Sequence, residues 1–264
     1  MTDDLKRVTH SFIVPREVKK YMANPVDEIL FSFIDPTDAL VRLLVMSPLA
    51  GCISEIKPVY LIQILHFVMK CTIICIADMA NLRLNARVSD TLADLCDGAR
   101  YARIQATLPI GTSALTSILF FDEIQRDEKG FVSGEGIIIV GGFFSKDARE
   151  SSYAKVSLGT FPKLGVSKAD AKRVVVQRFK KAMRAAQHAA IAQCYRDYNA
   201  KGGHILNLQS GQQMYFPKAV VLAVYADYPA TQKITLTGSA CPMCFTPLGK
   251  MSEGRSYDNE VDEM

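Results

Sequence analysis

The sequence predicts an α/β protein with a mixed sheet and one long helix. Three apolar segments, at 116–122, 136–144 and 153–161, follow one another at short spacings. Such short connections favour an antiparallel meander. A stretch with helical periodicity comes next, at 163–201, with Ser167 as its expected N-cap and Gly202-Gly203 as its expected end. A fourth apolar segment follows at 219–227. The predicted order is therefore strand, strand, strand, long helix, further strand.

Length and composition are those of a globular protein. The chain has 264 residues, of which 49% are hydrophobic and 22% charged, so it can bury a sizeable core and global disorder is excluded. Seven cysteines, an odd number, occur without a secretory signal at the start. This pattern favours a reducing compartment, with free thiols or a metal site, over a disulfide framework.

The first and fourth apolar segments each end on an acid, at Asp122 and Asp227. Mg²⁺ prefers hard oxygen ligands and is usually held by one or two carboxylates together with substrate phosphates. Two strand-end aspartates therefore predict a site for metal-dependent phosphoryl transfer. An aspartate after a strand is also a common turn former or helix cap, and the pattern alone does not decide between these roles. Together with the order of the segments, the two acids favour a ribonuclease-H-like sheet.

Four short motifs resemble a known family. Ser117-Ile-Leu-Phe-Phe-Asp122, Gly-Thr-Phe-Pro at 159–162, Ala226-Asp-Tyr-Pro229 and the Gly-x-x-Cys-x-x-Cys at 238–244 are similar to transposases of Plavaka-type cut-and-paste elements, within the CACTA-like group. The resemblance covers about residues 90–250. Its most specific part is the Asp-x-Pro segment followed by the paired cysteines.

The resemblance implies a DNA transposase that uses Mg²⁺ or Mn²⁺ to hydrolyse a DNA phosphodiester and transfer the strand. Asp122 and Asp227 would be catalytic metal ligands, completed by a third, later acid. The sequence reaches Met264 without the expected fifth strand, so we expect a fold incomplete at its C-terminus and poor or absent catalysis. Glu123, Asp127 and Glu128 are weaker candidates for a replacement ligand. The alternative is a non-catalytic nucleic-acid-binding or interaction protein derived from a transposon. A nuclear location, DNA as partner and a homo-oligomer are implied by the resemblance only.

The long helix is predicted to carry an apolar stripe toward the sheet and a basic surface. From Lys163 to Lys201 there are ten Lys or Arg and two acids, a net charge of +8, which leaves −4 for the rest of the chain with its total of +4. The stripe consists of Val176, Phe179, Met183, Ala186, Ala190, Cys194 and Tyr198. The basic cluster consists of Lys172, Arg173, Lys180, Lys181 and Arg184. This cluster is either an ordinary solvated face or a track for the phosphate backbone of DNA, with little sequence specificity.

The paired cysteines Cys241 and Cys244 predict half of a Zn²⁺ site, since a closed site needs two more ligands. In the related family the remaining ligands appear downstream of this pair, so Zn²⁺ is a second candidate cofactor. Cys71 and Cys75 are more typical of a buried thiol pair. A hairpin is expected at 203–217, in which His204 is more typical of a loop histidine than of a general base.

Residues 1–89 are predicted to be a mainly helical region, with Pro15 in the first turn of one helix and a second short helix at 36–46. The domain boundary is placed near residue 90. The transposase-like domain then spans 90–250, and 251–264 form an acidic, disordered tail. The apolar run at 56–79 is long enough to suggest a membrane span, but Gln63, His66 and Lys70 interrupt it. A buried helix is therefore favoured over a membrane helix, and an artefact of the gene model over 53–84 is a third hypothesis.

Overall fold

A computed structural model describes residues 5–49, 99–109, 111–125, 133–208, 211 and 213–226. The elements, in chain order, are β1 (Arg7–Ile13), α1 (Arg16–Lys19), β2 (Glu28–Ile34), α2 (Pro36–Met46), α5 (Ala99–Ala106), β3 (Ala114–Gln125), β4 (Ser133–Gly141), α6 (Lys146–Glu150), η4 (Ser152–Ala154), β5 (Lys155–Pro162), η5 (Asp170–Lys172), α7 (Val174–Ala200), β6 (His204–Asn207), β7 (Gln213–Phe216) and β8 (Lys218–Ala226).

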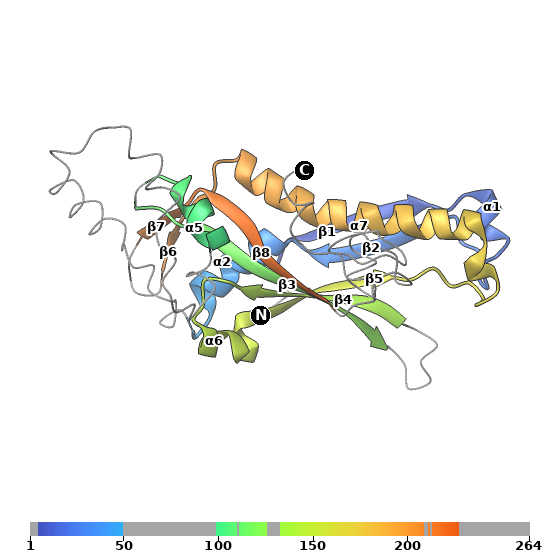
Figure 1. Ribbon diagram of the computed structural model, residues 1–264, viewed down its shortest axis with the longest axis horizontal. Coiled ribbons are helices and arrows are strands. Elements are labelled where there is room, and N and C mark those ends of the chain that lie inside the picture. Colours follow the sequence, from blue (N-terminus) through green and yellow to red (C-terminus); the bar gives the residue numbers. More distant parts are fainter. Residues whose placement is uncertain are drawn as a thin grey trace, which may run out of the picture.

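The main sheet has six strands in the order β1-β2-β5-β4-β3-β8. It is curled, and α7 runs lengthwise beside it (Figure 1). β3 pairs antiparallel with β4, and β4 pairs antiparallel with β5. After α7 the chain returns as β8, which lies beside β3 and parallel to it. The predicted mixed sheet, with an antiparallel meander, a long helix and a further strand, is confirmed.

The prediction that the N-terminal region is mainly helical was wrong. β1 and β2 form an antiparallel pair, and β2 joins them to β5 through the pairing of Phe33 with Gly159. The sequence signal that was missed is the alternation of side chains along the two strands. In the structure, His10 of β1 stacks on Phe31 and Phe33 of the facing strand β2. The prolines begin only the four-residue α1 and the eleven-residue α2. The predicted helix at 36–46 is therefore confirmed, whereas the boundary near residue 90 and the apolar run at 56–79 lie outside the described residues.

The larger cluster of buried side chains connects the N-terminal strands β1 and β2 with the rest of the sheet. Phe33 of β2, Leu43 of α2, Ile137 of β4 and Ile191 of α7 belong to one cluster of buried side chains. α2 packs against β3, β4, β5 and α7. Full burial of one such side chain contributes about 1.5–3 kcal/mol. The N-terminal strands and α2 are thus integral to the packing that fixes α7 on the sheet.

The long helix ends as the sequence predicts. Gly202 and Gly203, both with φ of 78°, follow the last helical residue and donate to the carbonyls of Asn199 and Tyr198. This pair of hydrogen bonds satisfies carbonyls that the helix leaves free. The start differs from the prediction. Ser167 accepts from the backbone of Asp170 at 3.1 Å and so caps the short η5 turn, while α7 begins at Val174.

The face of α7 that meets the sheet is broader than the predicted stripe. Its buried residues are Val176, Met183, Gln187, Ala190, Ile191, Cys194, Tyr195 and Tyr198. Ala186, which was assigned to the stripe, is exposed, and Phe179 is only partly buried. The predicted stripe left out Gln187, Ile191 and Tyr195, each of which directly follows one of its members and widens the contact on one side. The predicted hairpin is confirmed as the antiparallel pair of β6 and β7.

Candidate nucleic-acid interface and metal site

Asp122 lies within β3 and not at its end. Its Cα partner is Gly136, and the pairing of β3 with β4 continues to Gln125 opposite Ser133. The prediction that the strand ends at this acid was wrong, because the ladder with β4 holds the polar residues after Asp122 in extended conformation. The Asp122 side chain is exposed, as a carboxylate open to a ligand must be.

Asp227 lies outside the described residues, and so do Cys241 and Cys244. The described part of β8 ends at Ala226, whose Cα partner across the parallel pair is Phe121. The residues that immediately precede the two aspartates in the sequence are therefore paired on neighbouring strands. In the part of the chain that the structure describes, no group of three or more His, Cys, Asp or Glu side chains could hold a metal ion. Zinc binding by Cys241 and Cys244 stays a prediction.

The alternation of side chains along β3 places Asp122 on the sheet face opposite to α7. Ser117 is hydrogen-bonded to Tyr195 of α7 at 2.8 Å, and Phe121 packs edge-on against His188 of α7 with ring centroids 5.2 Å apart. Successive residues of a strand point to opposite faces. Asp122 therefore shares its face with Phe120, whose ring stacks on Tyr225 of β8 at 5.1 Å.

This opposite face is partly apolar and open. Phe120 is 36% exposed, Ile138 38% and Tyr225 51%. Asp122 is thus the acidic neighbour of an exposed aromatic pair, on the face of the sheet opposite to α7. The structure does not bring the basic cluster and this acid onto one surface.

Comparison of the chain with protein-family models, with curated proteins and with solved structures found no match.

The basic cluster lies on η5 and the first half of α7. Two of its five members have carboxylate partners: Arg173 with Asp170 and Arg184 with Glu135, each at 3.7 Å. The other members, Lys172, Lys180 and Lys181, have no carboxylate within 4.0 Å among the described residues.

Like charges crowd this half of the helix. Burial lowers the pKa of Lys180, and the neighbouring charges of Arg184 and Lys163 lower it further. Lys172 and Lys181 are exposed. The three lysines, which have no described carboxylate within 4.0 Å, leave a net positive charge that attracts a polyanion.

Beneath the basic cluster, α7 presents polar side chains to the sheet. Glu135 of β4 is 5% exposed and Gln187 of α7 is 2% exposed. Among the described residues, Glu135 Oε1, Gln187 Nε2 and His188 Nε2 are buried without hydrogen-bond partners. Burial lowers the pKa of His188 to about 4, with a smaller contribution from Arg184, so this imidazole is neutral at pH 7 and is not charged like its basic neighbours.

The sequence analysis did not identify these residues as a group. The available signal was their spacing, because Arg184, Gln187 and His188 fall on neighbouring positions of one helix face. Glu135 comes from a distant strand, and its contact with Arg184 depends on tertiary structure.

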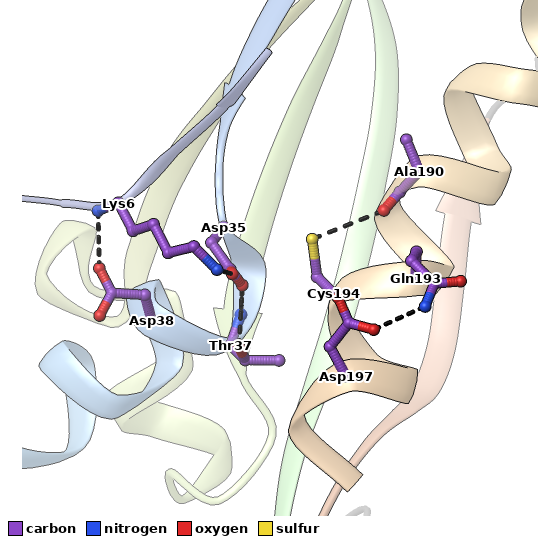
Figure 2. Close-up of polar contacts among 8 residues, drawn as sticks. All are labelled: Lys6, Asp35, Thr37, Asp38, Ala190, Gln193, Cys194 and Asp197. Atoms are coloured by element: carbon purple, nitrogen blue, oxygen red, sulfur yellow. Dashed lines mark hydrogen bonds and ion pairs between the residues drawn. The ribbon is translucent and has the colours of Figure 1, made fainter. Parts of the chain in front are cut away.

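A second polar group joins the start of β1 to α2 (Figure 2). Lys6 donates from its backbone N–H to Asp38 and from Nζ to Asp35, both at 2.9 Å. Asp35 also accepts from the backbone and hydroxyl of Thr37 at 3.0 and 2.8 Å. Burial raises the pKa of Asp35, but the hydrogen bonds from Lys6 and Thr37 outweigh this and lower it overall. These contacts cap α2, a structural role.

Cys194 of α7 faces this group, and its thiol donates to the carbonyl of Ala190 at 3.5 Å (Figure 2). Burial raises the pKa of the thiol to about 12, and the charge of Asp35 adds to the effect. The reactive form of cysteine is the thiolate, so Cys194 is a packing residue and not a nucleophile.

None of the described helices has the length and apolar character needed to cross a membrane.

Proposed function

We propose that this chain is a transposase-like, DNA-binding protein with a ribonuclease-H-like fold. The observation that carries the proposal is the strand arrangement, in which the β3-β4-β5 meander is followed by α7 and by β8, parallel to β3. The order of the apolar segments predicts the same arrangement, and the resemblance to Plavaka-type transposases implies it. A fold does not determine a function, so the binding activity is argued from the charged side chains.

Lys172, Lys180 and Lys181 are the residues that bind DNA in this proposal. Their charges are not offset by described carboxylates, and Lys180 and Lys181 lie on α7 while Lys172 lies on the η5 turn just before it. Phosphate contacts release counterions condensed on the DNA, which makes the affinity fall steeply with salt. Since contacts to phosphates carry no direct sequence information, the binding is expected to be weakly sequence-specific.

The test is the salt dependence of duplex DNA binding by the purified chain. Each lost phosphate contact lowers the slope of log K against log salt by about 0.9, so the triple variant K172Q/K180Q/K181Q is expected to lower it by about 2.7. K155Q is the matched control, because Lys155 is exposed on β5 and donates only to the Glu150 carbonyl at 3.2 Å. An unchanged slope in the triple variant would refute the proposed surface.

A second candidate function is metal-dependent phosphoryl transfer at Asp122 and Asp227. It is favoured by the pairing of Phe121 with Ala226, since each of these residues directly precedes one of the two acids in the sequence. A bound Mg²⁺ or Mn²⁺ would supply Lewis-acid activation of a phosphoryl group. Asp122 would offer an exposed carboxylate oxygen to that ion, while the stack of Phe120 on Tyr225 borders the site on one side.

The position of Asp122 argues that any cleavage is weak. DNA held by the basic cluster lies on the α7 side, whereas Asp122 is on the opposite face. We therefore expect binding that is insensitive to Mg²⁺ and little nicking of plasmid DNA. Robust nicking in Mg²⁺ or Mn²⁺ that is lost in D122N, but kept in the control D147N on the exposed surface of α6, would establish the catalytic function.

A further inference from the structure

A groove of about 520 Å³ lies between α5, the second half of α7 and β8. Arg100 and Arg103 of α5 and Arg196 of α7 line it. Its apolar lining includes Ile104, Val220 and Val221. The volume is within the range of small-molecule sites, which are concave, mostly apolar and carry a few placed polar groups.

The walls of the groove are held in place by hydrogen bonds. Gln105 of α5 donates to the backbone carbonyl of Thr112, which precedes β3, at 2.6 Å. Lys218, the first residue of β8, donates to Thr107 just after α5 at 3.4 Å. α5 is therefore fastened to the beginnings of β3 and β8, and the position of its arginines relative to β8 is set by the fold.

Arg196 is oriented by its own helix. Its Nε and Nη2 both donate to Gln193 Oε1, at 2.9 and 2.7 Å. The amide nitrogen of Gln193 donates in turn to Asp197 at 2.6 Å, and among the described residues no carboxylate lies within 4.0 Å of the Arg196 guanidinium. The bonds to Gln193 use only part of the guanidinium's N–H groups and hold the side chain in one orientation, so the others can bind a ligand.

The charge of the groove is not balanced within the described chain. Arg100, Arg103 and Arg196 are exposed, and none has a carboxylate within 4.0 Å among the described residues. Arg100 and Arg103 are three apart and lie on the same side of α5. Guanidinium groups bind phosphate by paired hydrogen bonds and stack on planar rings.

We propose that this groove binds a nucleoside phosphate, either free or as one nucleotide of a nucleic-acid strand. The arginines take the phosphate, and the apolar lining takes the base and sugar. A bare inorganic anion would leave that lining without a partner. The site is separate from the basic cluster, because Arg196 lies fifteen residues after Lys181, about 22 Å along the helix axis, and so the proposal stands without the function proposed above.

Calorimetric titration of the full chain with ADP, adenosine, inorganic phosphate and a single-stranded dT15 oligonucleotide tests this. ADP should bind more tightly than either adenosine or phosphate alone. R103Q and R196Q should each weaken ADP binding on the order of tenfold, since a hydrogen bond to a charged group contributes that much. K155Q is the matched control, because Lys155 is an exposed cation of β5 that does not line the groove, and it should leave ADP affinity unchanged.

The two sources of the nucleotide give different results. If the ligand is part of a strand, dT15 binds more tightly than ADP, competes with it and is weakened by R103Q. If the ligand is a free nucleotide, R103Q weakens ADP binding alone. Far-ultraviolet circular dichroism verifies that the variants are folded. ADP binding that is equal in wild type and both folded arginine variants, or equal affinity for ADP and inorganic phosphate, overturns the proposal.

Discussion

Acidification should destabilise the protein through His188 at neutral to mildly acid pH. The buried imidazole has its pKa lowered from 6.5 to about 4, first by burial and then by Arg184. Below pH 6.5 the unfolded chain takes up a proton that the folded chain does not, so the free energy of unfolding falls as the pH drops toward the folded pKa. Above pH 6.5 the imidazole is neutral in both states and has no such effect.

The size of the effect follows from the two pKa values. Integrating the difference in proton uptake gives a loss of about 2 kcal/mol between pH 7 and pH 5, and a limit of about 3 kcal/mol below the folded pKa. His188 packs edge-on against Phe121 and Phe161. The variant H188F keeps an aromatic ring between them, removes the titration and removes the buried nitrogen without a partner.

Urea unfolding of wild type and H188F at pH 7, 6 and 5 measures this contribution. The difference between the two proteins cancels titrations that both share. These include the titration of Asp35, whose pKa in the folded protein lies below 3.8, the ordinary pKa of an aspartate. Its stabilising contribution is therefore lost only as the pH falls below 3.8, outside the range of this assay. A wild-type-minus-variant difference that stays flat from pH 7 to pH 5 would refute the argument. The nuclear magnetic resonance titration of His188 gives its pKa directly.

Three further substitutions probe the fold. G203A is expected to lower the free energy of unfolding by about 3 kcal/mol or more, because its Cβ would stand 1.9 Å from a β7 backbone oxygen. G211A has φ of 79° but no atom within 4 Å of the added Cβ, so it should lower the free energy by about 1–2 kcal/mol. Urea unfolding midpoints compare the two variants. Y195F removes the hydrogen bond to Ser117 and should cost about 1 kcal/mol in the same assay. At the start of α2, D35A should lower stability by about 1 kcal/mol and D35N by less, because asparagine also caps a helix, as thermal unfolding at pH 7 can measure.

The sequence predicted the part of the fold in which local pattern and tertiary packing agree. The meander and the end of α7 at Gly202-Gly203 followed from apolar runs and glycine positions, and both are present in the structure. The N-terminal strands were missed because prolines were given more weight than alternation. His10, a polar residue, occupies the same side as Phe12 and stacks on the aromatic rings of β2. An exposed polar residue between the partly buried Val8 and Phe12 obscures the period-two signal.

The candidate sites depend more strongly on tertiary structure. Asp122 could be identified as a candidate ligand by residue type, and its neighbour Phe121 must point to the other face of the strand. Which of the two faces α7 was not predictable, because that depends on how the helix crosses the sheet. The arginines of the groove come from two helices, with Arg103 and Arg196 separated in sequence by the whole meander. No local pattern indicates that they share a surface.

The separation of charges in the structure constrains how the DNA binding and the cleavage proposed above could be combined. The basic cluster lies over the α7 side of the sheet, and Asp122 points to the side where Phe120 stacks on Tyr225. A duplex bound to the lysines alone cannot place a phosphate at that acid without wrapping around the edge of the sheet. β8 forms one edge of the described sheet, and the arginine groove meets it at its start, at Ala219–Val221. Asp122 follows Phe121, the partner of Ala226 at the other end of β8. A strand bound in the groove would have to run along β8 and around this edge to reach that acid, so under the proposed function, loss of the groove arginines should weaken any Asp122-dependent cleavage more than it weakens binding to duplex DNA.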